Sequence, residues 1–291
     1  MVEKTRSLLA TSRFPNVPSV VSNVGLGILI ASSSGGAVLA GNALGAMLAG
    51  VLLYIAGNFF NDWYDREWDA RHRQERALPM GLFKPSFYLV LALILACGGL
   101  TLGIWIGSGL PVCLLILLIA LYTRFHKQTK WAVIAMGLCR AMLLWLGAAS
   151  ISHSGNGTLL LFAMLALFCY IAGISLSARY ETMENPHSGA MLCARGLLIG
   201  AGLLNAGQAG FHLSALPYFI WLGVALTVFR RPLSRQVSAL LAGIPLLDWV
   251  IAFPLASGGH LWPSDYGAMG LWIAPLAFLG ALLLQRLAPA T

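Results

Sequence analysis

The sequence predicts an all-α fold, a polytopic membrane bundle of nine to ten transmembrane helices around a central cavity. Of the 291 residues, 58% are hydrophobic and only 10% are charged, whereas a soluble domain carries about a quarter of its residues as charges. Apolar segments of about 17–25 residues, the length that crosses a bilayer, recur along the whole chain. Because backbone amides in hydrocarbon must be hydrogen-bonded internally, we expect these segments to be helices.

Ten apolar segments are candidates for membrane crossings, and we expect the whole chain, 1–291, to form a single transmembrane domain. The fourth and eighth segments are short, so the pattern is compatible with nine or ten crossings. The N-terminal stretch also resembles a signal peptide, but nine further apolar segments follow it, so we expect a first membrane helix there. The segments are 17–34, 38–61, 86–107, 110–123, 131–151, 158–178, 190–208, 214–229, 236–256 and 268–286.

The basic residues in the loops between these segments alternate along the chain. Lys and Arg occur before the first segment and after every second one, whereas the loops near 35, 108, 154, 211 and 260 contain none. Cytoplasmic loops collect Lys and Arg, so we expect both termini and the basic loops to face the cytoplasm of a bacterial cell, with the chain in its inner membrane. The formal net charge of +8 then favours anionic membrane lipid and phosphate-bearing substrates as partners. A nucleic-acid partner is not expected, because the basic residues are divided among short loops.

Acidic residues are concentrated just after the second apolar segment. Of the ten carboxylates in the chain, five lie in the stretch 62–75. Asn58, Asp62, Asp65 and Asp69 follow the spacing of one helix face. Like charges at such spacings destabilise a helix by about 0.2–0.5 kcal/mol per pair, so these acids are expected to have positive partners.

Two kinds of positive partner are available to these acids. Mg²⁺ typically binds one or two carboxylates and fills its other positions with water and phosphate oxygens. Arg71, Arg73 and Arg76 follow directly and could bind phosphate oxygens. Alternatively, the acids and arginines pair with one another as a polar cap. The apolar neighbours Trp63 and Trp68 place the acids against the membrane, which favours a metal and diphosphate site.

The stretch AGNFFNDWYDREWDARHRQERALPMG resembles the first signature of the UbiA superfamily of intramembrane prenyltransferases, written NDxxDxxxD. Asn61, Asp62, Asp65 and Asp69 occupy its positions, and the arginines and the Leu-Pro-x-Gly turn that follow also match. Two softer matches lie downstream. The sequence YTRFHK resembles a Tyr-x-x-x-x-Lys loop of the family, and GLCRAMLLWLG resembles a further family segment.

The resemblance implies an enzyme that moves an isoprenoid chain from a polyprenyl diphosphate to a lipophilic acceptor, with Mg²⁺ as cofactor. It implies a metal site at Asp62, Asp65, Asp69, Glu181 and Glu184. It implies diphosphate binding by Asn58, Asn61, Arg73, Arg76, Lys127, Arg140 and Arg179. The catalytic residues would be Asp62, Asp65, Asp69 and Glu181, the last as the proton acceptor.

The second signature departs from the family pattern. Where relatives carry DxxxD at the end of the sixth span, the stretch ISLSARYETMENPHSG has Arg179, Glu181 and Glu184 but no aspartate. This Arg-Tyr-Glu variant, with an additional final helix, resembles the EboC-like branch of the superfamily. The altered motif keeps a second function open, that of a non-catalytic isoprenoid-binding, lipid-binding or export-associated membrane protein that uses the same cavity.

Two further interpretations concern single residues. An arginine inside a membrane helix is costly and points to a partner in the protein interior, so Arg140 either meets diphosphate or tethers its helix to an acid such as Asp248. An ion-coupled transporter would need acids at mid-membrane depth, and Asp248 alone is weak support for one. The six histidines are dispersed, without metal-ligand spacing, and we interpret them as solvated loop residues.

Overall fold

The computed structural model describes residues 2–33, 38–129, 131–151, 156–179, 188–258 and 268–288. In these ranges the chain is helical and contains no β-strand, which confirms the all-α prediction. The α-helices are α1 Val2–Thr11, α2 Val17–Ser32, α3 Ala40–His72, α4 Pro85–Trp105, α5 Gly109–Phe125, α6 Ala132–Ala149, α7 Gly157–Arg179, α8 Ser188–Gln208, α9 Leu216–Thr227, α10 Leu233–Ala242, α11 Ile244–Ser257 and α12 Ala268–Leu284. Short 3₁₀ helices, η1 Phe14–Asn16 and η2 Leu213–Ala215, precede α2 and α9.

Each predicted apolar segment corresponds to a helix or to a pair of consecutive helices. Seven helical spans of the described chain are long and apolar enough to cross a membrane, and three apolar helices are shorter. The ninth predicted segment is divided into α10 and α11 at Gly243, where Pro245 at the start of α11 cannot donate a backbone hydrogen bond. The number of nine to ten crossings stays a prediction.

Helix α3 is longer than its apolar segment. Its 33 residues give a length of about 50 Å, whereas the hydrocarbon core is about 30 Å thick. No Gly or Pro interrupts the sequence between Gly57 and His72, so the helix continues through the charged stretch beyond position 61. The acids therefore stand on the last turns of a rigid helix and not in a loop.

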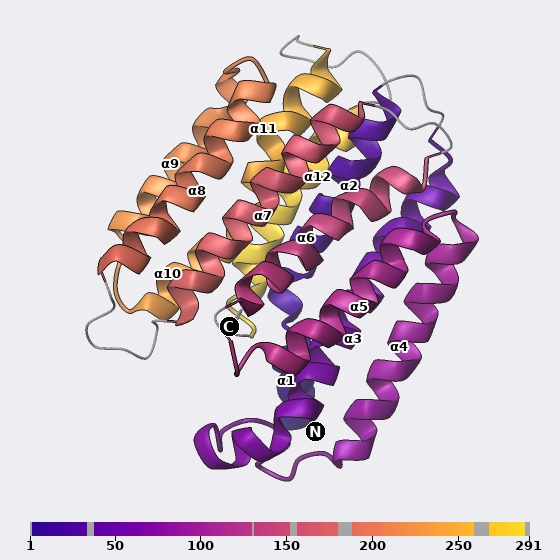
Figure 1. Ribbon diagram of the computed structural model, residues 1–291, viewed down its shortest axis with the longest axis vertical. Coiled ribbons are helices and arrows are strands. Elements are labelled where there is room, and N and C mark those ends of the chain that lie inside the picture. The colour runs from indigo at the N-terminus through magenta and orange to yellow at the C-terminus, as the bar shows by residue number, and fades with distance from the viewer. Residues whose placement is uncertain are drawn as a thin grey trace.

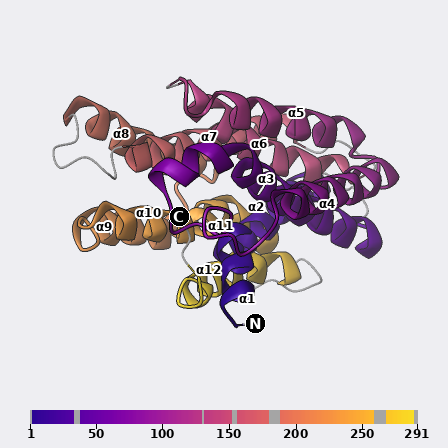
Figure 2. The same cartoon turned by 90° about the horizontal axis from the view of Figure 1, so that it is seen from below.

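Helix α2 is the central element of the bundle. It packs against α3, α6, α11 and α12, and viewed from below it lies between the α5–α8 side and the α11–α12 side (Figure 2). Its crossing with α6 depends on Gly27 and Gly147. A Cβ at Gly27 would overlap the backbone oxygen of Leu144, and one at Gly147 would overlap that of Val24. Glycine thus allows the two backbones to touch.

The successive membrane helices alternate in direction, so the N-terminus, the end of α3 and the end of α5 lie together at the lower end in Figure 1. We call this end, with the loops 73–84 and 126–129, the basic end. Short helix α1 lies there beside α3 and was not predicted, because its ten residues are mostly polar and show no apolar periodicity. The exposure of the basic end to the cytoplasm stays a prediction.

Candidate metal and diphosphate site

Three aspartates on the last turns of α3 form what we call the acid cluster: Asp62, Asp65 and Asp69. Asp65 and Asp69 are only 5% and 2% exposed, and the Asp62 side chain is 15% exposed. The spacing predicted that these side chains share one face, and the structure turns that face into the protein. Buried carboxylates need partners, because desolvating an unpaired charge costs several kcal/mol or more.

Two long basic side chains reach the acid cluster from the loops that follow α3 and α5. Arg76 Nη1 lies 2.8 Å from Asp62 Oδ1 and 3.0 Å from Asp69 Oδ2. Lys127 Nζ lies 3.0 Å from Asp65 Oδ2 and 3.8 Å from Asp69 Oδ1. In this arrangement the acids and bases satisfy one another. The same contacts would form the polar cap considered as an alternative above.

A histidine that the sequence interpretation missed also belongs to the site. His126 Nε2 lies 3.0 Å from Asp65 Oδ2, and its Nδ1 lies 3.0 Å from the backbone oxygen of Thr123. The His126 side chain is only 15% exposed. The interpretation of the histidines as solvated loop residues is therefore wrong for His126. Its only sequence signal was its place directly before Lys127.

The two asparagines on this face of α3 have different partners. Asn58 Nδ2 donates to the backbone oxygen of Ser12, 3.0 Å away, and so ties α3 to the N-terminal segment. Asn61 Nδ2 donates weakly to Asp65 Oδ2 at 3.3 Å. The Asn61 Oδ1 atom is buried and has no hydrogen-bond donor among the described residues.

These oxygens fit Mg²⁺. The set consists of the acid cluster carboxylates and the orphaned Asn61 Oδ1, all hard oxygen donors of the kind that Mg²⁺ prefers. Within the described chain no three His, Cys, Asp or Glu side chains converge as a ready-made metal site. A cation here would be held by one or two carboxylates and completed by phosphate and water. The cation would displace Arg76 or Lys127 from part of the acid cluster.

A pocket of about 570 Å³ lies beside Asp65, between the ends of α3 and α5. Aromatic side chains form one wall, and the Lys127 ammonium lies 3.8 Å from the centre of the Trp68 ring. The pocket gives Asp65 and Lys127 access to a volume large enough for a small ligand. A larger cavity in the centre of the bundle stays a prediction. The lining residues are Phe60, Trp63, Tyr64, Asp65, Arg66, Glu67, Trp68, Thr123, Arg124, His126, Lys127 and Gln128.

The remaining predicted residues at the basic end lie apart from the acid cluster or cannot be placed. Arg73 is exposed just after α3. Arg179 is exposed at the end of α7, and its Nη1 donates to the backbone oxygen of Thr129 at 3.0 Å. Glu181 and Glu184 lie outside the described residues, so their predicted metal and catalytic roles stay predictions.

Arg140 lies in a second polar group, which we call the buried polar network: Ser19, Ser22, Asn23, Arg140 and Asp248. Arg140 Nη1 donates to Ser19 Oγ at 3.0 Å and to Asn23 Oδ1 at 3.2 Å. Asp248 Oδ2 accepts from Ser22 Oγ at 2.6 Å and from Asn23 Nδ2 at 2.8 Å. The network thus joins α6 to α11 through α2. These contacts are the ones expected of an arginine that tethers its helix to its neighbours.

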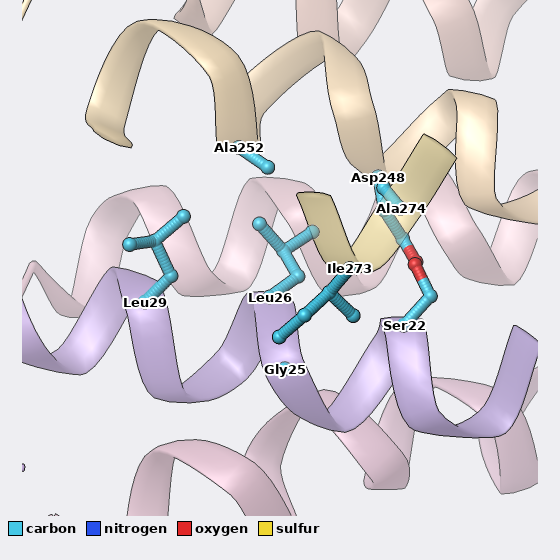
Figure 3. A pocket seen from close by; sticks show the side chains of 8 residues that line it. All are labelled: Ser22, Gly25, Leu26, Leu29, Asp248, Ala252, Ile273 and Ala274. Atoms are coloured by element: carbon cyan, nitrogen blue, oxygen red, sulfur yellow. The ribbon is translucent and has the colours of Figure 1, made fainter. Parts of the chain in front are cut away.

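Figure 3 shows the small pocket beside this network, with the Ser22 and Asp248 side chains pointing toward each other among apolar residues. Its volume is about 10 Å³, which is the space of about one water molecule. A diphosphate cannot enter it. The structure brings Arg140 together with Asp248 through Asn23, and within the described residues the Arg140 side chain hydrogen-bonds to Ser19 and Asn23 and not to the acid cluster.

Comparison with known proteins shows which family the chain belongs to. The sequence profile of the UbiA prenyltransferase family matches residues 20–244, and the chain belongs to that family. It is accordingly a multi-pass membrane protein. It is 29% identical over 234 residues to a protoheme IX farnesyltransferase of Pyrobaculum neutrophilum, covering 75% of this chain and 81% of that one. It is 27% identical over 175 residues to a digeranylgeranylglyceryl phosphate synthase of Natronomonas pharaonis, covering 57% and 60%.

Solved structures share the fold. A UbiA homolog from Archaeoglobus fulgidus bound to GPP and Mg²⁺ aligns with a TM-score of 0.53 and 14% sequence identity, over 96% of this chain and 99% of that one. At this identity the likeness concerns the fold alone. One relative is named a farnesyltransferase and the other a digeranylgeranylglyceryl phosphate synthase, and the matching profile is that of a prenyltransferase family, so prenyl transfer is supported at the level of the family.

Proposed function

We propose that this protein is an Mg²⁺-dependent prenyltransferase that moves an isoprenoid chain from a polyprenyl diphosphate to a lipophilic acceptor. The observation that carries the proposal is the acid cluster, in which three aspartates share one inward helix face, two of them buried, and are partnered by loop side chains. Membership of the family and the GPP and Mg²⁺ bound to the Archaeoglobus fulgidus homolog support it. The basic end would face the cytoplasm, where soluble diphosphates are available.

The reaction would begin when the allylic C–O bond of the substrate breaks and diphosphate leaves with the bonding electrons. Mg²⁺, when bound by Asp62, Asp65 and Asn61, supplies positive charge for the leaving diphosphate. Arg76 and Lys127, once displaced from the carboxylates, can donate to the diphosphate oxygens. The acceptor then forms a bond to the allylic carbon and loses a proton.

The residues that accept the proton and bind a second cation are proposed from the family resemblance alone. Glu181 would take the proton, and Glu184 would help to hold a second cation. Arg179 and Arg73 would bind diphosphate from the ends of α7 and α3, and Arg140 would do so only if its present partners Ser19 and Asn23 were replaced.

The alternative is a non-catalytic isoprenoid-binding or export-associated protein. It is favoured by the second signature, in which glutamates and Arg179 stand where relatives have aspartates. Such a protein would bind a prenyl diphosphate at the acid cluster without breaking its C–O bond.

One experiment separates the two functions. Purified protein in lipid nanodiscs is incubated with Mg²⁺, geranyl or farnesyl diphosphate, and a lipid extract as the source of acceptor. Diphosphate release and new prenylated masses are measured, with Asp62→Ala as the comparison. Release and a prenyl-sized mass increase that both vanish in Asp62→Ala support the enzyme. Binding of the substrate without release above the Asp62→Ala level would favour the alternative.

A further inference from the structure

His126 follows the last residue of α5 and is held by that helix. Its backbone N–H donates to the Tyr122 oxygen at 2.8 Å, and the residue keeps the helical conformation. The ring stacks on the Tyr122 ring, with centres 5.1 Å apart and planes 24° from parallel. Its Nδ1 lies 3.0 Å from the Thr123 backbone oxygen. These contacts fix the ring with its Nε2 directed at Asp65 of α3, 3.0 Å away.

The contacts of Asp65 all fall on one of its two carboxylate oxygens. Asp65 Oδ2 lies 3.0 Å from His126 Nε2 and 3.0 Å from Lys127 Nζ. It also accepts a hydrogen bond from Asn61 Nδ2 at 3.3 Å. Asp65 Oδ1 makes no hydrogen bond or ion pair to any residue that the structure describes. Because both oxygens of a carboxylate carry lone pairs, Asp65 is anchored through Oδ2 and open to another ligand through Oδ1.

The same anchored oxygen orients Asn61. Because the Asn61 amide directs its nitrogen at Asp65 Oδ2, the amide oxygen faces away from that atom, and it has no donor among the described residues. Asp65 Oδ1 and Asn61 Oδ1 are thus two unpartnered oxygens one turn apart on α3, both of the hard type that Mg²⁺ prefers. Their orientation depends on what holds Asp65 Oδ2.

His126 and Lys127 contact that oxygen at the same distance, but they would respond differently to a cation. Lys127 carries its charge on a flexible four-carbon stem, and its side chain is 26% exposed. Its ammonium repels a divalent cation and can move to phosphate oxygens. The His126 ring is 15% exposed and is fixed by Tyr122 and Thr123. A cation that displaces Lys127 would therefore leave His126 in place.

We propose that His126 is a positioning residue of the Mg²⁺ site, which holds Asp65 through Oδ2 and so keeps Asp65 Oδ1 and the Asn61 amide oxygen available to the cation. The inference rests on the proposed function. His126 would touch neither the cation nor the diphosphate and would act only through Asp65. Groups that hydrogen-bond to a metal ligand orient it, and their loss typically costs about 10–100-fold in metal affinity or activity.

The test compares two substitutions of His126 with a matched control. His126→Leu keeps an apolar side chain of moderate size and removes the donor, whereas the side-chain amide of His126→Gln can donate from near the position of Nε2. The control is His72→Leu. The His72 ring stacks on Trp68, with centres 4.1 Å apart, and its Nδ1 lies 2.9 Å from the Trp68 backbone oxygen. These local contacts match those of His126, but His72 is exposed and makes no ion pair with a described acid.

The measurement is the dependence of ligand binding on Mg²⁺. Full-length wild type and variants in nanodiscs are titrated with geranyl S-thiolodiphosphate without metal and over a series of Mg²⁺ concentrations. This gives the metal-free affinity and the Mg²⁺ concentration that produces half of the gain in affinity. The thermal unfolding midpoint is measured on the same samples, and kcat and KM for geranyl diphosphate are measured at low and at saturating Mg²⁺.

His126→Leu is expected to raise the half-saturating Mg²⁺ concentration by about tenfold or more and to leave the metal-free affinity unchanged. Its kcat should fall at low Mg²⁺ and recover in large part at saturating Mg²⁺, because the cation can still bind to a less ordered Asp65. His126→Gln should regain most of the Mg²⁺ affinity, and His72→Leu should match the wild type throughout.

Four results would overturn the inference. One is the same half-saturating Mg²⁺ concentration in His126→Leu and His72→Leu. A second is a weakened metal-free affinity together with a lowered unfolding midpoint and no recovery in His126→Gln, which would show a structural role. A third is a loss of metal-free affinity alone, which would place His126 on the diphosphate. If binding by the wild type does not respond to Mg²⁺, the proposed function fails first and this inference falls with it.

Discussion

The acid cluster and the buried polar network both place charged side chains inside the apolar bundle, but they differ in where the partners of those side chains come from. The carboxylates of the acid cluster are partnered mainly by long side chains from the loops that follow α3 and α5. The single atom Asp65 Oδ2 contacts His126 and Lys127, and it also accepts a hydrogen bond from Asn61 of α3. A pocket of about 570 Å³ adjoins them. In the buried polar network the partners stand within helices, and the adjoining pocket measures about 10 Å³.

This difference separates a site that can exchange its partners from one that cannot. Loop side chains can swing away from a carboxylate and make room for a metal ion and phosphate. The hydroxyl and amide groups around Asp248 are short and fixed by helix packing, so removing one leaves a polar group unsatisfied. Charge in the first region is therefore expected to serve binding and chemistry, and charge in the second to hold α2, α6 and α11 together.

The largest expected effect is on turnover in Asp65→Ala. Removing a group that stabilises the leaving diphosphate should lower the rate by a factor on the order of 10²–10³, with little change in the thermal midpoint. Prenyl transfer in nanodiscs measures the rate. The matched control is Glu67→Ala, since Glu67 is also on α3 but its side chain is 80% exposed. Equal turnover in the two variants would show that the acid cluster has no special role in the reaction.

Asp248→Ala is expected to have the largest effect on stability. It leaves the buried Arg140 without a nearby negative charge and strips Ser22 and Asn23 of their acceptor. Leaving a buried donor unsatisfied costs about 1–3 kcal/mol, and two donors lose their acceptor here, so the free energy of unfolding in detergent should fall by about 2–6 kcal/mol. Asp248→Asn, which keeps an acceptor oxygen, should lose less. Unchanged stability together with lost turnover would show that Asp248 acts in the reaction and not in helix packing.

A moderate loss of stability is expected for Gly27→Ala, at the crossing of α2 and α6 that supports the buried polar network. The new methyl would overlap the Leu144 backbone oxygen, and overpacking of this kind costs about 1–3 kcal/mol. In Gly196→Ala the methyl meets nothing within 4 Å, so that control should be neutral or gain up to about 1 kcal/mol of helix propensity. Unfolding experiments on both variants decide whether the close approach matters. Equal stabilities would show that α2 and α6 can separate without cost.

The smallest effect is expected for Arg66→Ala. Arg66 pairs with Glu67 at 3.3 Å, and both side chains are accessible, at 35% and 80%. Exposed pairs contribute less than about 1 kcal/mol, so stability should change little and turnover should stay within about twofold. A large loss of turnover, measured as above, would extend the functional region from the acid cluster to the outer wall of the pocket.

Local pattern was enough to predict the helices and the acid face. Apolar length located the membrane helices, and the spacing of Asp62, Asp65 and Asp69 placed them on one side of α3. The sequence could not predict that His126 reaches Asp65, because that contact joins residues 61 positions apart and depends on how α3 and α5 pack. A tether from Arg140 to Asp248 was one of two interpretations of that arginine, the other being diphosphate binding, and the intervening Asn23 of α2 was not predicted.

The central claim is that the acid cluster exchanges its basic partners for Mg²⁺ and a diphosphate. The most direct measurement is the affinity of the wild type and of Asp62→Asn for geranyl S-thiolodiphosphate, each with and without Mg²⁺. We expect Mg²⁺ to strengthen wild-type binding by about tenfold or more, equivalent to about 1.4 kcal/mol, and we expect this gain to vanish in Asp62→Asn while the metal-free affinity is kept. A wild-type affinity that does not respond to Mg²⁺, or a gain that survives in Asp62→Asn, would contradict the claim.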